Sequence, residues 1–234
     1  MNPRTWQFLS GTGIKIIGIV LMVIDHVHQM FIDRGAPGWM SWFGRPVATM
    51  FLFLCAEGFF YTRSKKRYML QFLGGFIFMS VMNQILSAVM FMEHITLINN
   101  IFGTLFMAVY YMWMIDLIRE GARDKRPVRI ISAIGGLLLP LAISLAVFLT
   151  MRSGNYTAAL IICFIPNPLS VEGGFVLVFM GAAFYLLRKY RPAQAALVLI
   201  ISALTWYSSK DTPGDFHWLI FSAIIPIFLY NGKR

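Results

Sequence analysis

An aspartate and two histidines interrupt an apolar stretch near the start of the chain. The stretch IVLMVIDHVHQMF, residues 19–31, contains Asp25, His26 and His28. On a helix, side chains three and four positions apart share a face, so Asp25 can meet His28 and Gln29. His26 points about 100° away from Asp25, so the two are not automatically a hydrogen-bonded dyad. Histidine titrates near neutral pH, so His26 is a candidate general base or acyl acceptor, with a polar staple between helices as the alternative.

Further polar groups are expected at the same depth. Arg45 stands in FGRP at the start of the next apolar stretch, and its long side chain can bend inward to neutralise Asp25. Three more groups fall on the same side by topology and are candidates for the mouth of a cavity: His94, Asp215 and His217. The convergence of Asp25, His26, His28 and Arg45 makes an active site as probable as a structural staple.

Several polar side chains lie deeper in the apolar segments. Glu57 is the hardest to explain as packing, because an ionised carboxylate in hydrocarbon must be protonated, paired or hydrated. Hydrogen bonds between helices account for the four amides, Asn83, Gln84, Asn99 and Asn100.

The composition excludes a soluble globular domain. Hydrophobic residues make up 58% of the 234 residues, charged residues only 13%, and the mean hydropathy is +0.69. Apolar stretches long enough for a hydrocarbon core of about 30 Å recur from end to end, which predicts one transmembrane domain over residues 1–234. Cys55 and Cys163 both lie in apolar segments, so we expect neither a disulfide nor a metal site. The first stretch lacks a signal cleavage site and should remain as the first helix.

The fold predicted is all-α, a polytopic membrane helix bundle. Eight spanning helices are expected at 13–32, 43–61, 68–92, 95–118, 128–150, 171–187, 193–208 and 216–230. A ninth apolar run, 157–165, is too short to cross. Because the neighbouring segments leave and enter on the same side, residues 155–168 are predicted to form a re-entrant or interfacial element.

The distribution of basic residues predicts the orientation. Of the 20 Lys and Arg residues, 16 fall on one side of the predicted helices and 4 on the other. The positive-inside rule makes the richer side cytoplasmic, with both termini there, in a multi-pass protein of the cell membrane. The same rule explains the net charge of +10. The basic residues do not form the clustered patch that is typical of a protein that binds nucleic acid.

Cations close to the cytoplasmic helix ends suit an anionic ligand such as a phosphorylated cofactor, although topology alone predicts most of them. They stand in TRSKKRY and in the terminal LYNGKR. The candidate cofactor-binding residues are Arg63, Lys65, Lys66, Tyr230, Asn231, Lys233 and Arg234.

Four separated stretches form a pattern that spans nearly the whole chain: KIIGIVLMVIDHVHQMF, the segment from FGRPVATMF to SVMNQ, NNIFGTLFMAVYY and the C-terminal LYNGKR. In their order and spacing these stretches resemble the TraX family. The prototype of that family is associated with amino-terminal acetylation of F-type pilin. The family is also similar to transmembrane acyltransferases, which take acetyl-CoA from the cytosol and modify a substrate across the membrane.

The resemblance implies roles at matching positions. The family's Asp-His pair in helix 1 corresponds to Asp25 and His26. The family's Gly-Arg pair at the start of helix 2 corresponds to Gly44 and Arg45. The resemblance adds further positions as a set: Glu57, Gly58, Thr62, Arg63, Gln84, Asn100 and residues 230–234. His28, Glu57, Gln84, Asn100, Asp215 and His217 are the predicted supporting or substrate-binding residues.

We therefore predict an acetyltransferase with acetyl-CoA as co-substrate. His26 acts as general base or brief acetyl carrier, and Asp25 with Arg45 fixes the local charge. The thioester oxyanion needs a donor, for which Arg45, Asn83, Gln84 and Asn100 remain open. The expected partners are the lipid bilayer, the CoA thioester and an extracytoplasmic peptide, glycan or lipid acceptor. A proton-coupled transporter and a noncatalytic assembly factor are the alternatives.

Overall fold

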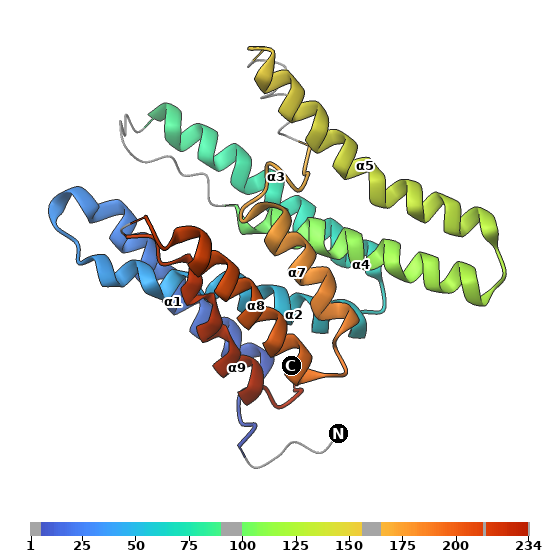
Figure 1. Ribbon diagram of the computed structural model, residues 1–234, viewed down its shortest axis with the longest axis horizontal. Coiled ribbons are helices and arrows are strands. Elements are labelled where there is room, and N and C mark those ends of the chain that lie inside the picture. Colours follow the sequence, from blue (N-terminus) through green and yellow to red (C-terminus); the bar gives the residue numbers. More distant parts are fainter. Residues whose placement is uncertain (1–5, 90–99, 156–164, 213, 234) are drawn as a thin grey trace. The chain divides into compact units, whose positions relative to one another are not determined.

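The computed structural model describes residues 6–89, 100–155, 165–212 and 214–233, and these residues form helices without any named strand (Figure 1). In chain order the elements are α1 (Gly11–Phe31), η1 (Ile32–Arg34), η2 (Gly38–Gly44), α2 (Val47–Tyr61), α3 (Lys65–Val89), α4 (Ile101–Arg123), α5 (Pro127–Arg152), α7 (Gly174–Leu186), α8 (Arg191–Ser209), η3 (His217–Ala223) and α9 (Ile224–Leu229). The elements labelled η are 3₁₀ helices.

The all-α fold is confirmed. Each of the eight predicted segments overlaps a helix, and four helical stretches among the described residues are long and apolar enough to cross a membrane: Gly11–Arg34, Gly38–Tyr61, Ile101–Arg123 and Pro127–Arg152. The count of eight spans stays a prediction. α3 and α8 carry more polar side chains and do not meet that criterion. Most of the predicted re-entrant element, residues 156–164, lies outside the described residues.

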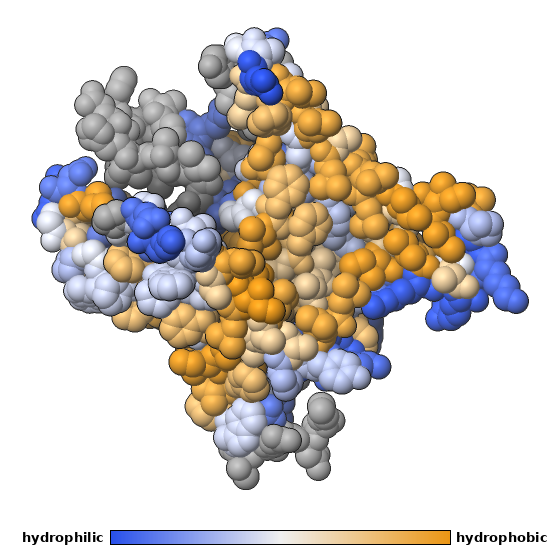
Figure 2. Space-filling view, viewed as in Figure 1, coloured by the Kyte–Doolittle hydropathy of each residue, from blue (hydrophilic) through white to orange (hydrophobic). Residues whose placement is uncertain are grey.

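Apolar side chains cover much of the surface, as expected for helices that face lipid. Ile16, Val20 and Val23 are about half exposed on α1, and α5 exposes large apolar residues from Val128 to Met151. Figure 2 shows the hydrophobic colour along α5, giving way to hydrophilic residues at the α4–α5 turn. A soluble protein rarely exposes apolar surface on this scale.

The chain divides into two compact units. The first contains Met1–Glu57 and Ala183–Arg234, and the second contains Gly58–Ala182. α2 and α7 each run along the chain from one unit into the other. The single domain expected for residues 1–234 stays a prediction.

In the first unit, α1 and the η2–α2 segment form an antiparallel hairpin. The Ser10 hydroxyl accepts a hydrogen bond from the Gly13 N–H at 3.0 Å, which satisfies a donor in the first turn of α1. After η1 the chain reverses through Gly35, whose φ of 85° lies in the left-handed region that glycine adopts without strain. Pro37 then precedes η2 with an extended backbone.

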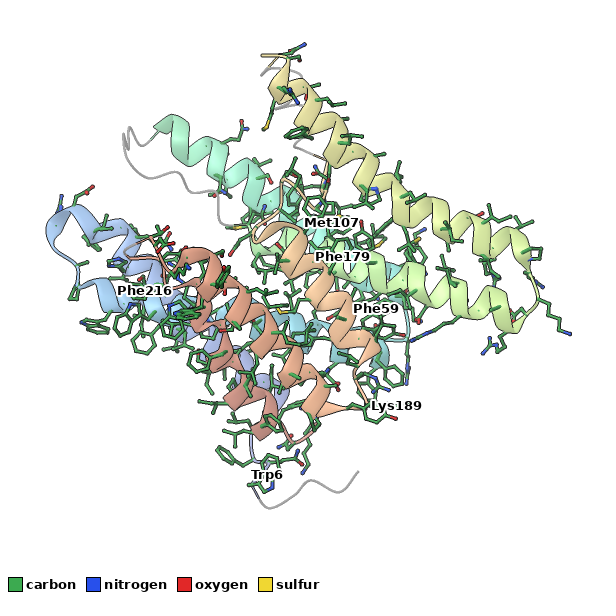
Figure 3. All side chains as sticks on the ribbon, viewed as in Figure 1. Trp6, Phe59, Met107, Phe179, Lys189 and Phe216 are labelled. Carbon is green, nitrogen blue, oxygen red and sulfur yellow. The ribbon has the colours of Figure 1, made fainter. Side chains whose placement is uncertain are left out.

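The first unit has two distinct ends. At the termini end, Leu9 pairs with Tyr230 in a parallel bridge, and the Gly11 N–H donates to the Lys233 carbonyl at 2.7 Å. At the turn end, where α1 leads into η2 and α8 leads into η3, the Trp42 and Phe216 rings pack with centroids 5.2 Å apart. Figure 3 shows Trp6 and Phe216 at opposite ends of this unit.

The second unit packs α3, α4, α5 and α7 around an apolar core. Its buried centre consists of Met107, Tyr111, Val171, Val178 and Ala182. Polar side chains join its helices: the Tyr110 hydroxyl of α4 donates to the Gly136 carbonyl of α5 at 2.9 Å. Such bonds between helices are worth about 0.6–2 kcal/mol each in a membrane.

Candidate functional site

Asp25 is buried where α1 meets the end of η2. Its side chain lies directly against Gly44: a Cβ added at that glycine would stand 2.4 Å from the Asp25 carboxyl carbon. One carboxylate oxygen, Oδ2, accepts a hydrogen bond from Gln29 Nε2 at 2.7 Å, which confirms that Asp25 meets Gln29 one turn later. The other oxygen, Oδ1, is buried without a hydrogen-bond partner among the described residues.

Arg45 does not neutralise Asp25, and that prediction is wrong. No ion pair within 4.0 Å joins the two side chains in the described part of the chain. The Arg45 Nη1 instead donates to His217 Nε2 at 3.1 Å, while its Nε is buried without a partner in that part. The reason is steric, because the Gly44 backbone already fills the space beside Asp25 and the arginine extends toward η3 instead.

His217 is the centre of a hydrogen-bonded chain at the turn end. An arginine can only donate, so His217 Nε2 must accept the bond from Arg45, and the proton of the neutral ring must sit on Nδ1. That Nδ1–H donates to Asp215 Oδ1, and Asp215 Oδ2 accepts from the Ser209 hydroxyl at 2.6 Å. The structure therefore joins Arg45 to His217 and Asp215, although Arg45 lies 172 positions before His217 in the sequence. In Figure 3 the neighbouring Phe216 lies among aromatic side chains at this end.

His26 is held in one tautomer by its own helix. Its Nδ1 lies 2.8 Å from the Met22 carbonyl oxygen, and because a carbonyl only accepts, Nδ1 carries the proton. In the neutral ring the lone pair is therefore on Nε2, which has no hydrogen-bond partner among the described residues. His26 is half-buried, between the exposed Val23 and Met30 on neighbouring turns. Its ring is thus available to a group that approaches from the side of α1 away from Asp25.

His28 lies on the buried side of α1. It is 8% exposed, and its Nδ1 is buried without a hydrogen-bond partner among the described residues. The residues spaced along the same stripe are Ile17 and Leu21, which precede His28 by three turns and two turns. The two histidines of helix 1 therefore face different surroundings, and only His28 continues the stripe that leads to Asp25.

The Asp215 carboxylate makes the stability of the turn end depend on pH. The Ser209 hydroxyl and the His217 backbone N–H donate to it and lower its pKa to about 2, although partial burial opposes them. A carboxyl with a lowered pKa stabilises the fold fully above its unfolded pKa of about 3.9 and loses that contribution as the pH falls toward the folded value.

We therefore expect Asp215→Asn to be less stable than the parent at pH 5 and equally stable near pH 2. Solvent screening keeps the difference small, because the carboxylate is partly exposed. Thermal unfolding of both proteins across this pH range measures it. A difference that stays constant with pH would contradict the assignment.

Glu57 is buried in a cationic environment at the end of α2. It is 7% exposed, and the guanidinium groups of Arg191 and Arg188 act on it electrostatically. Arg191 is itself held firmly: its guanidinium lies 4.9 Å from the centroids of both the Phe53 and the Tyr230 rings. Arg188 and Arg191 thus supply the positive charges that the buried Glu57 carboxylate needs. The positive-inside pattern alone had placed both arginines in a cytoplasmic loop.

At the termini end, two of the four predicted cofactor-binding residues, Tyr230 and Asn231, stabilise the fold. Tyr230 is 3% exposed and packs edge-on against Phe53. The Asn231 side chain accepts from the Lys233 N–H at 2.8 Å and donates to the Phe8 carbonyl at 3.2 Å. The Lys233 side chain is exposed and available to a ligand. Arg234 and His94 lie outside the described residues.

In the second unit, Lys65 forms an ion pair with Asp116, which is 9% exposed. Sequence reasoning missed Asp116, although an acidic residue inside an apolar run is the same signal that singled out Asp25 and Glu57. Arg63 and Lys66 are exposed. Of the three predicted cations in TRSKKRY, only Lys65 has an acidic partner within the described parts of the chain.

The two candidate amides of the second unit differ: Asn100 holds helices together, whereas Gln84 is exposed. Asn100 uses its amide group to donate to the Phe76 carbonyl at 2.9 Å and to the Ser80 hydroxyl at 3.1 Å. Both amide hydrogens are therefore engaged, which leaves Asn100 no donor for an oxyanion. Gln84 is exposed and has no such role in the packing. Among the described residues, no three His, Cys, Asp or Glu side chains gather as metal ligands would.

Comparison with known proteins identifies the family. No curated protein and no solved structure matches the chain. The family model described as TraX protein matches residues 10–229, which includes α1 and the turn end and leaves out the Leu9–Tyr230 bridge of the termini end. Because this match covers nearly the whole chain, the protein belongs to the TraX family.

Proposed function

We propose that this protein is a multi-pass membrane acetyltransferase that uses cytosolic acetyl-CoA and modifies an amine or hydroxyl on the opposite side. The observation that carries the proposal is the state of His26. A histidine held as the Nδ1–H tautomer, with Nε2 unbonded, is a base ready to accept a proton. It stands in a membrane-spanning helix of a TraX family member, and the family's association with pilin acetylation supports the same chemistry.

The reaction is an acyl transfer. His26 Nε2 removes the proton from the acceptor, whose nitrogen or oxygen forms a bond to the acetyl carbonyl carbon. The carbon–sulfur bond of the thioester breaks, and the CoA thiolate leaves and takes up the proton. In the alternative route, Nε2 attacks the thioester first and briefly carries the acetyl group before the acceptor takes it.

The orientation predicted from the basic residues places the termini end in the cytoplasm and the turn end outside. Eight spans and a re-entrant element at 155–168 complete this proposed topology. From Gly11 to His26, α1 rises about 22 Å, so the pantetheine arm of acetyl-CoA has to cover that distance. The acceptor then arrives from outside, as a peptide amino terminus, a glycan or a lipid headgroup.

Charge at the site supports the same assignment. Asp25 is a buried carboxylate in α1, and Arg45 is held by His217 within the same unit. The donor to the developing oxyanion stays open among Arg45, Asn83 and Gln84. Asn100 no longer competes for that role.

For the cofactor, we assign the CoA phosphates to exposed cations at the predicted cytoplasmic side. In the first unit the candidate is Lys233, with Arg234 beside it in the sequence. In the second unit the candidates are Arg63 and Lys66, because Lys65 already pairs with Asp116.

Calorimetry on the purified protein in lipid nanodiscs tests this assignment. Acetyl-CoA and CoA should both bind, and Lys233→Ala should weaken binding about fivefold to tenfold, the loss of one charge-assisted contact. Lys189→Ala is the matched control, since Lys189 is exposed and follows α7 at the same predicted side. It should bind like the parent.

Absence of binding to a folded protein would overturn the acetyltransferase. A proton-coupled transporter would then become the leading function, because a transporter has no reason to recognise the thioester. Binding without any transfer would instead favour a noncatalytic assembly factor.

A further inference from the structure

The turn between α4 and α5 is a cationic surface of the second unit. Residues 119–129 contain five Lys or Arg residues and two acidic residues. Every residue from Ala122 to Val128 is exposed. α4 and α5 are both long and apolar enough to span a membrane, so the turn that joins them lies at a membrane surface. Figure 2 shows the hydrophilic colour of the turn directly beside the hydrophobic surface of α5.

The two acidic side chains of this turn are already paired with arginines. The ion pairs are Arg123–Asp124 at 3.2 Å, Arg129–Asp124 at 3.2 Å and Arg129–Glu120 at 3.5 Å. Lys125 and Arg126 form no ion pair within 4.0 Å in the part of the chain that the structure describes. Two exposed cations therefore stand at the tip of the turn without an acidic neighbour to neutralise them.

Lys125 occupies a position where the backbone favours glycine. The Arg126 N–H donates to the Gly121 carbonyl at 2.8 Å, and the Lys125 N–H donates to the Ala122 carbonyl at 3.4 Å. These two bonds form a Schellman motif, in which the residue after the helix is left-handed and is usually glycine. Lys125 has a φ of 54°, and it is the only non-glycine residue with a positive φ within the described ranges. The turn therefore keeps a cation at the position where a side chain strains the backbone.

The balance of charge across the membrane does not explain this placement. The positive-inside rule counts the cations of a loop, and a lysine at any exposed position of the turn would satisfy it. A lysine held in a strained conformation indicates a local use for its charge.

Exposed apolar side chains follow the two cations directly. Val128 and Ile131 of α5 are 74% and 68% exposed. Ile131 lies about 6 Å along the helix axis from Pro127, the first residue of α5. The cations and the apolar side chains therefore follow each other in the same order as the headgroup and the acyl chains of a lipid.

We propose that the α4–α5 turn binds an anionic phospholipid, with the headgroup phosphate at Lys125 and Arg126 and an acyl chain along Val128 and Ile131. The ammonium and guanidinium groups donate charge-assisted hydrogen bonds to the phosphate oxygens. None of these four residues belongs to the proposed acetyl-transfer site or to the proposed contacts with CoA. The lipid site therefore stands or falls independently of the proposed function.

Native mass spectrometry of the detergent-purified protein with palmitoyl-oleoyl phosphatidylglycerol tests the site. Lys125→Gly and Arg126→Gln should each weaken binding of this lipid about fivefold, and the double variant about 25-fold, because each cation acts separately on the anionic headgroup. Lys125→Arg is the matched control, since it keeps the charge at the same place, and it should bind like the parent. Phosphatidylcholine with the same chains has no net charge, so the parent and the double variant should bind it equally.

Thermal unfolding in detergent without added lipid separates a use of the charge from a structural role of Lys125. Lys125→Gly relieves the left-handed strain, so its melting temperature should rise by about 2–4 °C although its lipid binding falls. Lys125→Arg should melt like the parent. Melting of Lys125→Gly below the parent would overturn the argument from strain, because Lys125 would then stabilise the turn.

Three results of the lipid-binding measurement would overturn the site. The first is equal binding of phosphatidylglycerol by the parent and by the folded double variant. The second is displacement of the lipid by inorganic phosphate, which would make the turn a site for a free anion. The third is displacement of the lipid by acetyl-CoA, which would make the turn part of the cofactor site.

Discussion

Replacing His26 with alanine is expected to lower the rate of acetyl transfer by about 10²-fold to 10⁴-fold, the usual contribution of a general base. The affinity for acetyl-CoA should stay unchanged, because the proposed phosphate contact at Lys233 lies about 22 Å away at the other end of α1. Transfer of labelled acetyl from acetyl-CoA to membranes that contain the acceptor measures the rate. Calorimetry measures the affinity on the same preparation.

Chemical rescue separates catalysis by His26 from a structural role. Added imidazole should restore part of the activity of His26→Ala, since it can replace the missing base in the space that the side chain leaves. Met22→Ala, one turn earlier on the same half-buried side, is the control. Activity of His26→Ala within threefold of the parent would remove His26 from the mechanism.

Replacing Gly44 with alanine should destabilise the first unit by about 1–3 kcal/mol, the cost of overpacking a filled space. The new Cβ would stand 2.4 Å from the Asp25 carboxyl carbon, closer than two carbon atoms can approach. Either α1 and η2 must separate, or Asp25 must leave its position beside Gln29. Unfolding of the purified protein by heat or by denaturing detergent measures the loss.

Gly38 at the start of η2 provides the control for this substitution. A Cβ added there would meet nothing within 4 Å, and neither glycine has the positive φ that would strain an alanine. Gly38→Ala should therefore unfold like the parent. Equal stability of Gly38→Ala and Gly44→Ala would show that Asp25 does not pack against the η2 backbone as described.

Periodicity and hydropathy predicted the elements of this protein well, because a membrane restricts the chain to apolar helices of nearly constant length. Two segments differ in detail. The segment 43–61 begins at the end of η2 and turns at residues 45–46 before α2 starts. The segment 216–230 is not one α-helix. It begins as a 3₁₀ helix, His217–Ala223, and becomes α-helical only in α9. Pro226 cannot donate a hydrogen bond within this segment, and no hydropathy pattern reports such a change of helix type.

The partners of the candidate residues were harder to predict. The bond from Gln29 to Asp25 followed from helical spacing, since both residues lie on one helix. The bond between Arg45 and His217 joins residues 172 positions apart, and the sequence indicated only that both stand on one side of the membrane. The choice of His217 over Asp25 depends on the close approach at Gly44, which is a property of packing and not of pattern.

The pairing of the two chain ends has a consequence for biosynthesis. The bridge between Leu9 and Tyr230 closes the first unit with residues from both ends of the sequence, whereas the second unit is contiguous. The ribosome completes the second unit before the last helices emerge, at about 5–20 residues per second. α1 must wait in the bilayer for roughly 10–40 s without its final neighbours, so Arg45 meets His217 only at the last step of assembly. During that interval only residues of the α1–η2 hairpin contact the Asp25 carboxylate. The early contacts of Asp25 with Gln29 and Gly44 are therefore the ones that keep α1 in the membrane.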